Sequence, residues 1–279
     1  MKITVRHETL YTYSRPVRLA PHLFRLHPRL DGALRLLDQQ LHLEPEPVGQ
    51  APCLDAEGNV VVNAWFDAMT ERLRIVSRFE VETLRQNPFE YLLGLGAERL
   101  PLRYDEGLEA VLAGYCTRQY QDGAVAAFAH GIAADCGSRT LEFLAALNAR
   151  IQETCPGIIR EEGWAHPPEH TLRVRTGSCR DVAVVFIEAC RAVGIAARFV
   201  SGYQTGALDR GAQRYMHAWA EVFLPGGGWR GYDPTQGIAI ADQHVAVAAS
   251  RESRHATPIE GAFQGAGATS TIEAHIEHQ

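Results

Sequence analysis

Alternating apolar and polar residues dominate the first third of the chain. Residues 2–13 and 34–43 alternate in this way, and residues 60–66 and 73–81 are rich in β-branched and aromatic side chains. Such runs, bounded by turn-forming residues, predict antiparallel strands with one face buried. Residues 55–59 (DAEGN) carry a turn signal between two of them. The first part of the chain is therefore predicted to form an antiparallel β domain.

The pattern becomes helical and alanine-rich between residues 106 and about 155. Residues 140–151 (TLEFLAALNARI) carry apolar side chains at three- and four-residue steps, which is typical of an amphipathic helix. The sequence CPG at residues 155–157 contains two helix-breaking residues and ends the pattern. The middle of the chain is therefore predicted to be helical.

A more deeply buried helix is predicted after a turn at Gly177 and Ser178. From Val182 onward apolar residues recur at helical spacing, and Gly194 supplies the stop. Ser178 suits the N-cap, so that Cys179 falls on the first turn, where free N–H groups and the helix dipole favour a thiolate. Cys179 is thus a candidate nucleophile, although an isolated free cysteine is more often a small buried apolar residue.

A β-hairpin is predicted to carry a base and an acid at its open end. Its first strand begins at His217 and its second ends at Asp233, with a glycine-rich turn between them. In a regular antiparallel pair the two residues lie directly opposite each other only if the turn is centred on Pro225. A tight turn at residues 226–227 would place them on opposite faces. We therefore expect an odd-length loop or a bulge, which keeps imidazole and carboxylate on one face.

Composition excludes several classes of function. The 279 residues carry a formal net charge of -6 and no basic stripe, so nucleic-acid binding is not expected. No apolar run is long enough for a membrane span, and the N-terminus lacks the apolar segment of a signal peptide, which favours a cytoplasmic protein without membrane contact. The six cysteines form no CxxC pair, and prolines separate His166 from His170, so neither disulfides nor a metal site is predicted.

The three candidate residues have a joint chemical logic. A thiolate nucleophile needs a base that takes a proton and later gives it to the leaving group, and the base needs a carboxylate that fixes its tautomer. Cys179, His217 and Asp233 supply these groups in that order along the chain. Taken singly, a histidine on a strand or an aspartate before proline is more often structural.

Three aromatic residues are further candidates for substrate binding: Trp164, Tyr203 and Trp219. Aromatic side chains that flank a site on strands more often form its wall or the core behind it. Arg180 and Asp181, beside the candidate nucleophile, are better explained by capping or ion pairing, because an acidic residue in the first helical turn suits the dipole.

Four runs of the sequence closely resemble the bacterial transglutaminase-like superfamily: GSCRDVA (177–183), RAVGIAARFVSGY (191–203), HAWAEV (217–222) and GWRGYDPT (228–235). The resemblance implies a papain-like cysteine-catalysis fold in which Cys179, His217 and Asp233 are the catalytic residues. Residues 2–17 and 55–59 likewise resemble the β-rich N-terminal domain that accompanies this subfamily.

Together these observations predict an α+β protein. We expect an N-terminal antiparallel β domain over residues 1–90 and a papain-like, transglutaminase-like cysteine core over residues 91–265. The alternating residues 266–279 are expected to return to the N-terminal sheet as a strand, since an unpaired terminal strand would leave an exposed edge.

The expected reaction is acyl transfer at an amide or peptide bond, through a thioester on Cys179 and without a cofactor or metal. The resemblance favours water as the acceptor, which would make the protein a peptidase or amidase acting on a peptide or protein substrate. An amine acceptor would make it a protein-glutamine transglutaminase, and the chemistry up to the thioester is the same for both. A third alternative is a non-catalytic module whose cleft only binds a peptide.

Overall fold

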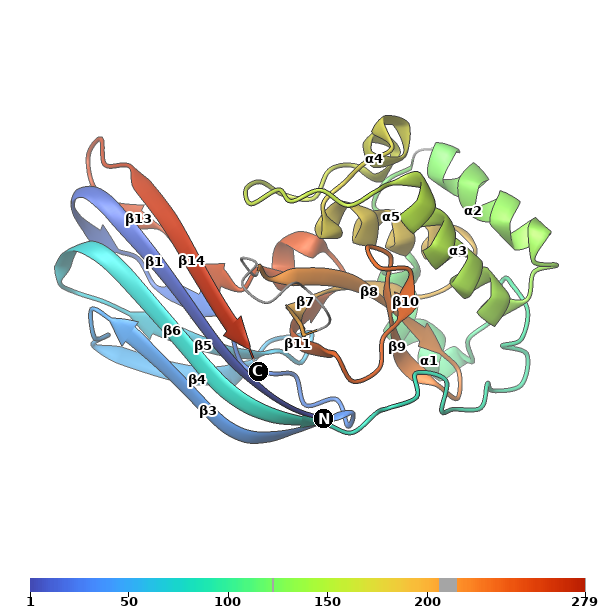
Figure 1. The fold of residues 1–279 in the computed structure, drawn as a ribbon, viewed down its shortest axis with the longest axis horizontal. Coiled ribbons are helices and arrows are strands. Elements are labelled where there is room, and N and C mark those ends of the chain that lie inside the picture. Colours follow the sequence, from blue (N-terminus) through green and yellow to red (C-terminus); the bar gives the residue numbers. More distant parts are fainter. Residues whose placement is uncertain (122, 206–214, 279) are drawn as a thin grey trace.

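The computed structural model describes residues 1–121, 123–205 and 215–278 (Figure 1). Strands fill the N-terminal part, five α-helices follow, and a second set of strands completes the core. The predicted α+β class is confirmed. No helix in these three ranges is both long and apolar enough to cross a lipid bilayer.

Two antiparallel sheets form the N-terminal part. Its first six strands are β1 (Lys2–Leu19), β2 (His22–Phe24), β3 (Leu34–Glu44), β4 (Gly49–Leu54), β5 (Val60–Trp65) and β6 (Met69–Thr83). The C-terminal segment adds β12 (Ile259–Glu260), β13 (Phe263–Gln264) and β14 (Ser270–His278). One sheet has the order β13-β1-β6-β3, with β14 also paired to β1, and the other has the order β12-β2-β5-β4.

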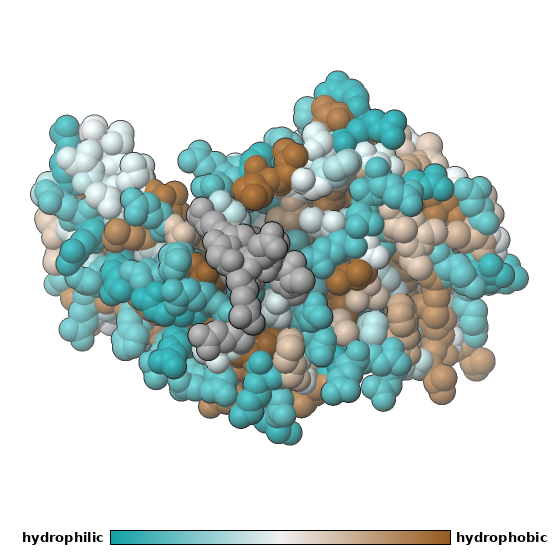
Figure 2. Space-filling view, viewed as in Figure 1, coloured by the Kyte–Doolittle hydropathy of each residue, from teal (hydrophilic) through white to brown (hydrophobic). Residues whose placement is uncertain are grey.

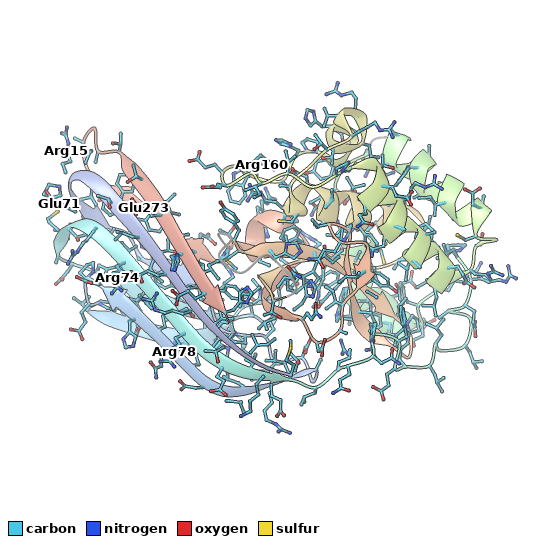
Figure 3. The ribbon with its side chains drawn as sticks, in the orientation of Figure 1. Arg15, Glu71, Arg74, Arg78, Arg160 and Glu273 are labelled. Carbon is cyan, nitrogen blue, oxygen red and sulfur yellow. The ribbon has the colours of Figure 1, made fainter. Side chains whose placement is uncertain are left out.

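The alternation in the sequence decides which face of each strand is buried. Along β6, Leu73, Ile75 and Phe79 are fully buried, while Arg74 and Arg78 point to the solvent side (Figure 3). The apolar faces of the two sheets meet in one cluster that joins β1, β2, β5 and β6. Hydrophilic side chains cover much of the visible surface of this lobe (Figure 2).

The C-terminal segment is part of the N-terminal sheets. Strand β14 pairs with β1 from Val5 opposite His278 to Tyr13 opposite Ser270. The return begins earlier than residue 266, because β12 already pairs with β2 and β13 with the end of β1. Both chain ends therefore lie on this lobe (Figure 1).

Helix α5 is the centre of the core. The helices are α1 (Glu106–Cys116), α2 (Gly123–Asp135), α3 (Thr140–Thr154), α4 (Pro168–Val174) and α5 (Cys179–Ala192), with a short 3₁₀ helix, η1 (Ser253–Ala256). Helices α2, α3 and α4 contact α5 on one side and the core sheet contacts it on the other. Val182, Val185 and Phe186 are fully buried, and each such side chain stabilises the fold by roughly 1.5–3 kcal/mol. Packing therefore holds α5, and with it Cys179, in one position.

The core sheet is antiparallel throughout, with the order β10-β9-β8-β7-β11. Its strands are β7 (Ala197–Gln204), β8 (His217–Leu224), β9 (Gly228–Asp233), β10 (Ile238–Ala239) and β11 (His244–Ser250). Helix α5 packs against β7 and β8. The sheet thus brings both ends of the predicted hairpin next to the helix that carries Cys179.

The hairpin loop has an odd number of residues, as predicted. Leu224 pairs with Gly228, which leaves the three residues 225–227 as the loop. Its centre is Gly226 and not Pro225, so His217 and Asp233 do not lie directly opposite each other. Gly226 takes a positive φ of 81°, a conformation that a proline cannot adopt, so the turn moves one residue along.

The register nevertheless keeps the two groups together. Continuing the observed pairing places Asp233 opposite Trp219, which lies two residues from His217. Because side chains alternate with a period of two, a shift of two residues preserves the face. Imidazole and carboxylate therefore lie on one face in a diagonal arrangement.

The N-terminal lobe and the core share buried contacts. Val5 and Phe79 of the N-terminal sheet pack against Tyr203 and Val245 of the core sheet. The buried side chain of Asn59 adds two hydrogen bonds to one residue of β11: its amide donates to the carbonyl of Ala249 at 2.9 Å, and its oxygen accepts from the Ala249 N–H at 2.8 Å.

We expect Asn59→Ala to lower the free energy of unfolding by about 2–3 kcal/mol, because it leaves a buried N–H and a buried carbonyl without partners. Chemical denaturation of the two proteins measures the difference. Asn63→Ala is the matched control, since the Asn63 side chain is bonded to the exposed Cys53 and its loss should change stability by less than about 0.5 kcal/mol. Equal effects of the two substitutions would contradict the bridging role of Asn59.

Candidate active site

Cys179 is the first residue of α5, as the sequence predicts. Ser178 is the N-cap, and it forms a capping box with Asp181, whose side chain accepts from the Ser178 backbone N–H. This arrangement fixes the first turn, where the N–H groups without helical partners and the dipole favour negative charge. The half-buried Cys179 sulfur therefore lies where a thiolate is stabilised.

A network around the buried Asp181 holds the preceding loop against this helix end. The carboxylate accepts from the Ser178 N–H and hydroxyl, both at 2.8 Å, from the His166 N–H at 2.7 Å, and from the Arg160 guanidinium at 2.5 Å. Burial alone would raise the pKa of Asp181, but these hydrogen bonds and the charge of Arg160 lower it. The predicted capping role of Asp181 is confirmed.

Two arginines also hold the loop in place, through hydrogen bonds to its carbonyl groups. Arg160, labelled in Figure 3, also donates to the carbonyls of Glu162 and Trp164. Arg180 donates to the carbonyls of Arg160 and Glu162, at 2.6 and 2.9 Å. Carbonyl groups that would otherwise need water are thereby satisfied by side chains from the helix end and from the loop itself. These bonds therefore hold the loop before α5 in place next to the start of the helix.

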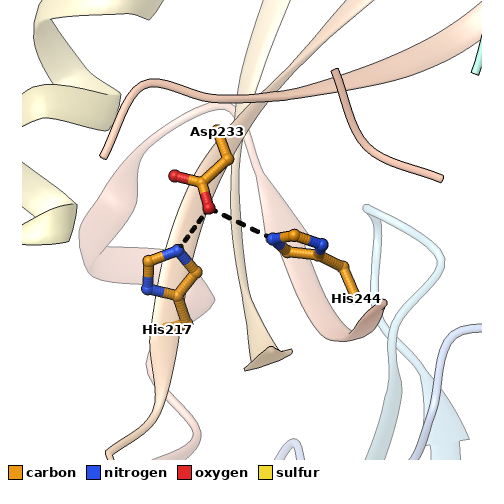
Figure 4. Close-up of side chains that lie close together, drawn as sticks. All are labelled: His217, Asp233 and His244. Atoms are coloured by element: carbon orange, nitrogen blue, oxygen red, sulfur yellow. Dashed lines mark hydrogen bonds and ion pairs between the residues drawn. The ribbon is translucent and has the colours of Figure 1, made fainter. Parts of the chain in front are cut away.

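His217 and Asp233 are in direct contact. The Nε2 atom of His217 lies 2.7 Å from Oδ2 of Asp233, and the second oxygen of the carboxylate accepts from the Thr235 N–H at 2.9 Å (Figure 4). Asp233 is fully buried, whereas the side chain of His217 is 14% exposed. A reacting group could therefore reach the imidazole only through its exposed part.

The sulfur of Cys179 also acts on the imidazole. Burial lowers the pKa of His217, but the hydrogen bonds to Asp233 and Cys179 and the charges of both outweigh it and raise the pKa to about 10. Since Nε2 faces Asp233, Nδ1 is the ring nitrogen available to Cys179. The three residues predicted from the sequence therefore converge in one group.

A second histidine contacts the same carboxylate. His244, at the start of β11, has its Nε2 atom 3.1 Å from Oδ2 of Asp233 (Figure 4). Burial raises the pKa of Asp233, but the hydrogen bonds from His217 and His244 overcome this effect, so that it lies well below its usual range. The sequence contains no signal for His244, because its strand is separated from β9 by two others.

His217, Asp233 and His244 also form a group whose ligand atoms lie within 4.8 Å of one another, the one such group found in the described parts of the chain. Each of these atoms already takes part in a hydrogen bond within the group. We therefore describe it as a hydrogen-bonded network and assign no metal to it.

Comparisons with known proteins match two regions of the chain to family models. Residues 3–82 match the family model described as the bacterial transglutaminase-like N-terminal region, and residues 126–234 match that of the transglutaminase-like superfamily. The chain belongs to the transglutaminase-like superfamily. The second match contains all three residues of the Cys179, His217 and Asp233 group.

Relatives that match nearly the whole of this chain occur in bacteria. An uncharacterised protein of Mycobacterium leprae is 26% identical over 276 residues, covering 96% of this chain and 95% of its own length. A protein-glutamine gamma-glutamyltransferase of Pseudomonas aeruginosa is 38% identical over 71 residues, covering 23% of this chain and 11% of that protein. A crystal structure from Cytophaga hutchinsonii, named as a candidate cysteine protease, shares the fold with a TM-score of 0.72 and 20% identity, covering 100% of this chain and 90% of that one.

The three aromatic residues predicted to bind substrate have different environments. Trp164 is 65% exposed and lines an open cavity of about 700 Å³ together with Tyr120 and Arg251. Tyr203 is completely buried, and its hydroxyl bonds Nδ1 of His7 at 2.8 Å, so that it packs the interface with the N-terminal sheet and has no exposed surface for a substrate. Trp219 is only 2% exposed, and its ring contacts the ring of His217.

Asp181→Asn is expected to destabilise the protein by about 2–4 kcal/mol at neutral pH, because a buried acceptor of four hydrogen bonds loses its charge. The lowered pKa means that the carboxylate contributes fully above its unfolded value near 3.9, and that this contribution disappears as the pH falls through the folded value. The stability gap between the two proteins should therefore narrow below about pH 4 in denaturation experiments.

Asp67 is exposed and serves as the control. Asp67→Asn should change the free energy of unfolding by less than about 0.5 kcal/mol at every pH. If the difference in stability between wild type and Asp181→Asn stayed constant from pH 7 to pH 3, the charge of Asp181 would play no part in stability.

Proposed function

We propose that the protein is a cysteine-dependent hydrolase of amide or peptide bonds in which Cys179, His217 and Asp233 form the catalytic triad. The observation that carries the proposal is that one imidazole interacts with two groups: it lies 2.7 Å from Asp233, and the Cys179 sulfur at the start of α5 helps to raise its pKa. The transglutaminase-like fold provides a cysteine-based catalytic scaffold, and this arrangement supplies the groups that its chemistry requires.

The first half of the reaction forms a thioester. The Cys179 thiolate attacks the substrate carbonyl carbon, and the negative charge moves to the carbonyl oxygen, near the N–H groups of the first turn of α5. The intermediate then breaks its C–N bond while the His217 imidazolium gives a proton from Nδ1 to the leaving amine. Asp233 holds Nε2 throughout and stabilises the imidazolium.

The second half releases the acyl group. Neutral His217 takes a proton from a water molecule, whose oxygen attacks the thioester carbon, and breakage of the C–S bond restores the thiolate and the imidazolium. The substrate is proposed to be a peptide or protein in the cytoplasm. An amine in place of water would give transamidation, the chemistry that the name of the Pseudomonas aeruginosa relative describes.

The acceptor is tested by incubating the protein with a set of glutamine-containing peptides and a labelled primary amine. We expect free acid or cleaved peptide as the product, formed by wild type and lost by more than about 1,000-fold in Cys179→Ala. Incorporation of the amine as the main product would replace hydrolysis by transglutamination. Tight peptide binding without any turnover would favour the non-catalytic binding module.

Thiol reactivity tests the nucleophile without a substrate. Near neutral pH, iodoacetamide should alkylate Cys179 at least about 10-fold faster than the exposed Cys53, because the imidazolium and the helix end favour the thiolate. His217→Ala should slow this reaction by about 10-fold, and Cys53→Ser, the matched control, should leave it unchanged. Mass spectrometry of the labelled peptides gives both rates, and a Cys53 that reacted as fast as Cys179 would contradict the proposed ion pair.

A further inference from the structure

His244 approaches Asp233 from β11, an edge strand of the core sheet. Its side chain is 1% exposed, and its Nε2 atom shares Oδ2 of the carboxylate with Nε2 of His217. The Thr235 N–H holds the other oxygen. Three donors therefore fix both oxygens of one buried carboxylate, and Figure 4 shows the two histidines among them.

The surroundings of His244 define its tautomer. Its Nδ1 atom is buried and has no hydrogen-bond partner among the described residues. Burial and the charge of His217 lower the pKa of His244, against the opposing effect of Asp233. The ring is therefore neutral at neutral pH, with its one hydrogen on Nε2, where the carboxylate accepts it.

A glycine leaves room for the tryptophan ring that packs against His244. Gly202 of β7 lies between the two histidine-bearing strands and pairs with His217. A Cβ atom on Gly202 would lie 2.1 Å from the Val245 carbonyl oxygen and 2.6 Å from the ring of Trp219. The space that it leaves free lets Trp219 pack edge-on against His244, with ring centroids 5.2 Å apart.

We propose that His244 is a positioning residue for the reaction, which holds the Asp233 carboxylate in place while His217 changes its protonation state. This inference rests on the proposed function. When His217 loses its proton, its bond to Asp233 loses the charge on the donor and weakens. The N–H of His244 keeps its charge state through that step, so that Oδ2 stays where His217 needs it for the next proton transfer.

The alternative is that His244 only satisfies a buried acceptor and fills space. The two roles differ in what a substitution does to turnover. A positioning role requires an N–H at the place of Nε2 and acts on kcat, whereas a packing role depends on volume and acts on stability.

The experiment compares His244→Gln, which keeps an N–H near the position of Nε2, with His244→Leu and His244→Phe, which remove it. We expect kcat to fall about 10- to 100-fold in the Leu and Phe variants with KM changed less than about 3-fold, and the Gln variant to stay within about 3-fold of wild type. Two apolar variants are used so that one that folds poorly does not decide the result. Thermal denaturation gives the folded fraction of each.

Alkylation of Cys179 by iodoacetamide is measured on the same variants, because it needs no substrate. Slower alkylation in the Leu and Phe variants with recovery in the Gln variant would support the positioning role even if wild type turned over no substrate, a result that would refute only the proposed hydrolysis. Wild-type kcat and alkylation in a folded Leu or Phe variant would overturn the inference. Equal losses in all three variants would also overturn it, in favour of packing.

Discussion

The ionised carboxylate of Asp233 is removed from water completely, and the arrangement of the core sheet around it follows from that burial. A buried charge is tolerated only where donors replace its hydration. Here the donors are His217 on β8, His244 on β11 and the N–H of Thr235 just beyond β9. Each strand must therefore sit in one register, because a slip of one residue would turn its side chain away from the carboxylate.

Asp181 is a second buried carboxylate that needs hydrogen-bond donors around it. Its buried carboxylate joins the cap of α5 to the loop carrying Arg160 and His166, and its lowered pKa has the same kind of cause as that of Asp233. Two buried carboxylates thus organise the surroundings of Cys179: Asp181 holds the helix end, and Asp233 holds the imidazole. In the proposed reaction, such pre-organisation means that these groups need little rearrangement when a substrate binds.

The N-terminal lobe stabilises this arrangement from behind. It packs on the β7 and β11 side of the core sheet, through the cluster that contains Tyr203 and through the bonds of Asn59 to Ala249. Strand β11 also carries His244, so the lobe supports the strand on which the third donor to Asp233 depends. This covering also protects the edge of the core sheet, which would otherwise expose unpaired backbone groups.

The sequence by itself determined the elements and the three candidate catalytic residues. Helical spacing from Val182 and a capping pattern at Ser178 located Cys179, and alternation located the hairpin of His217 and Asp233, because these signals arise from neighbours along the chain. Only the tertiary structure decided which strands lie side by side. It brought His244 to Asp233 and buried Tyr203 in an interface. Those outcomes depend on packing between segments far apart in the sequence, which local patterns do not encode.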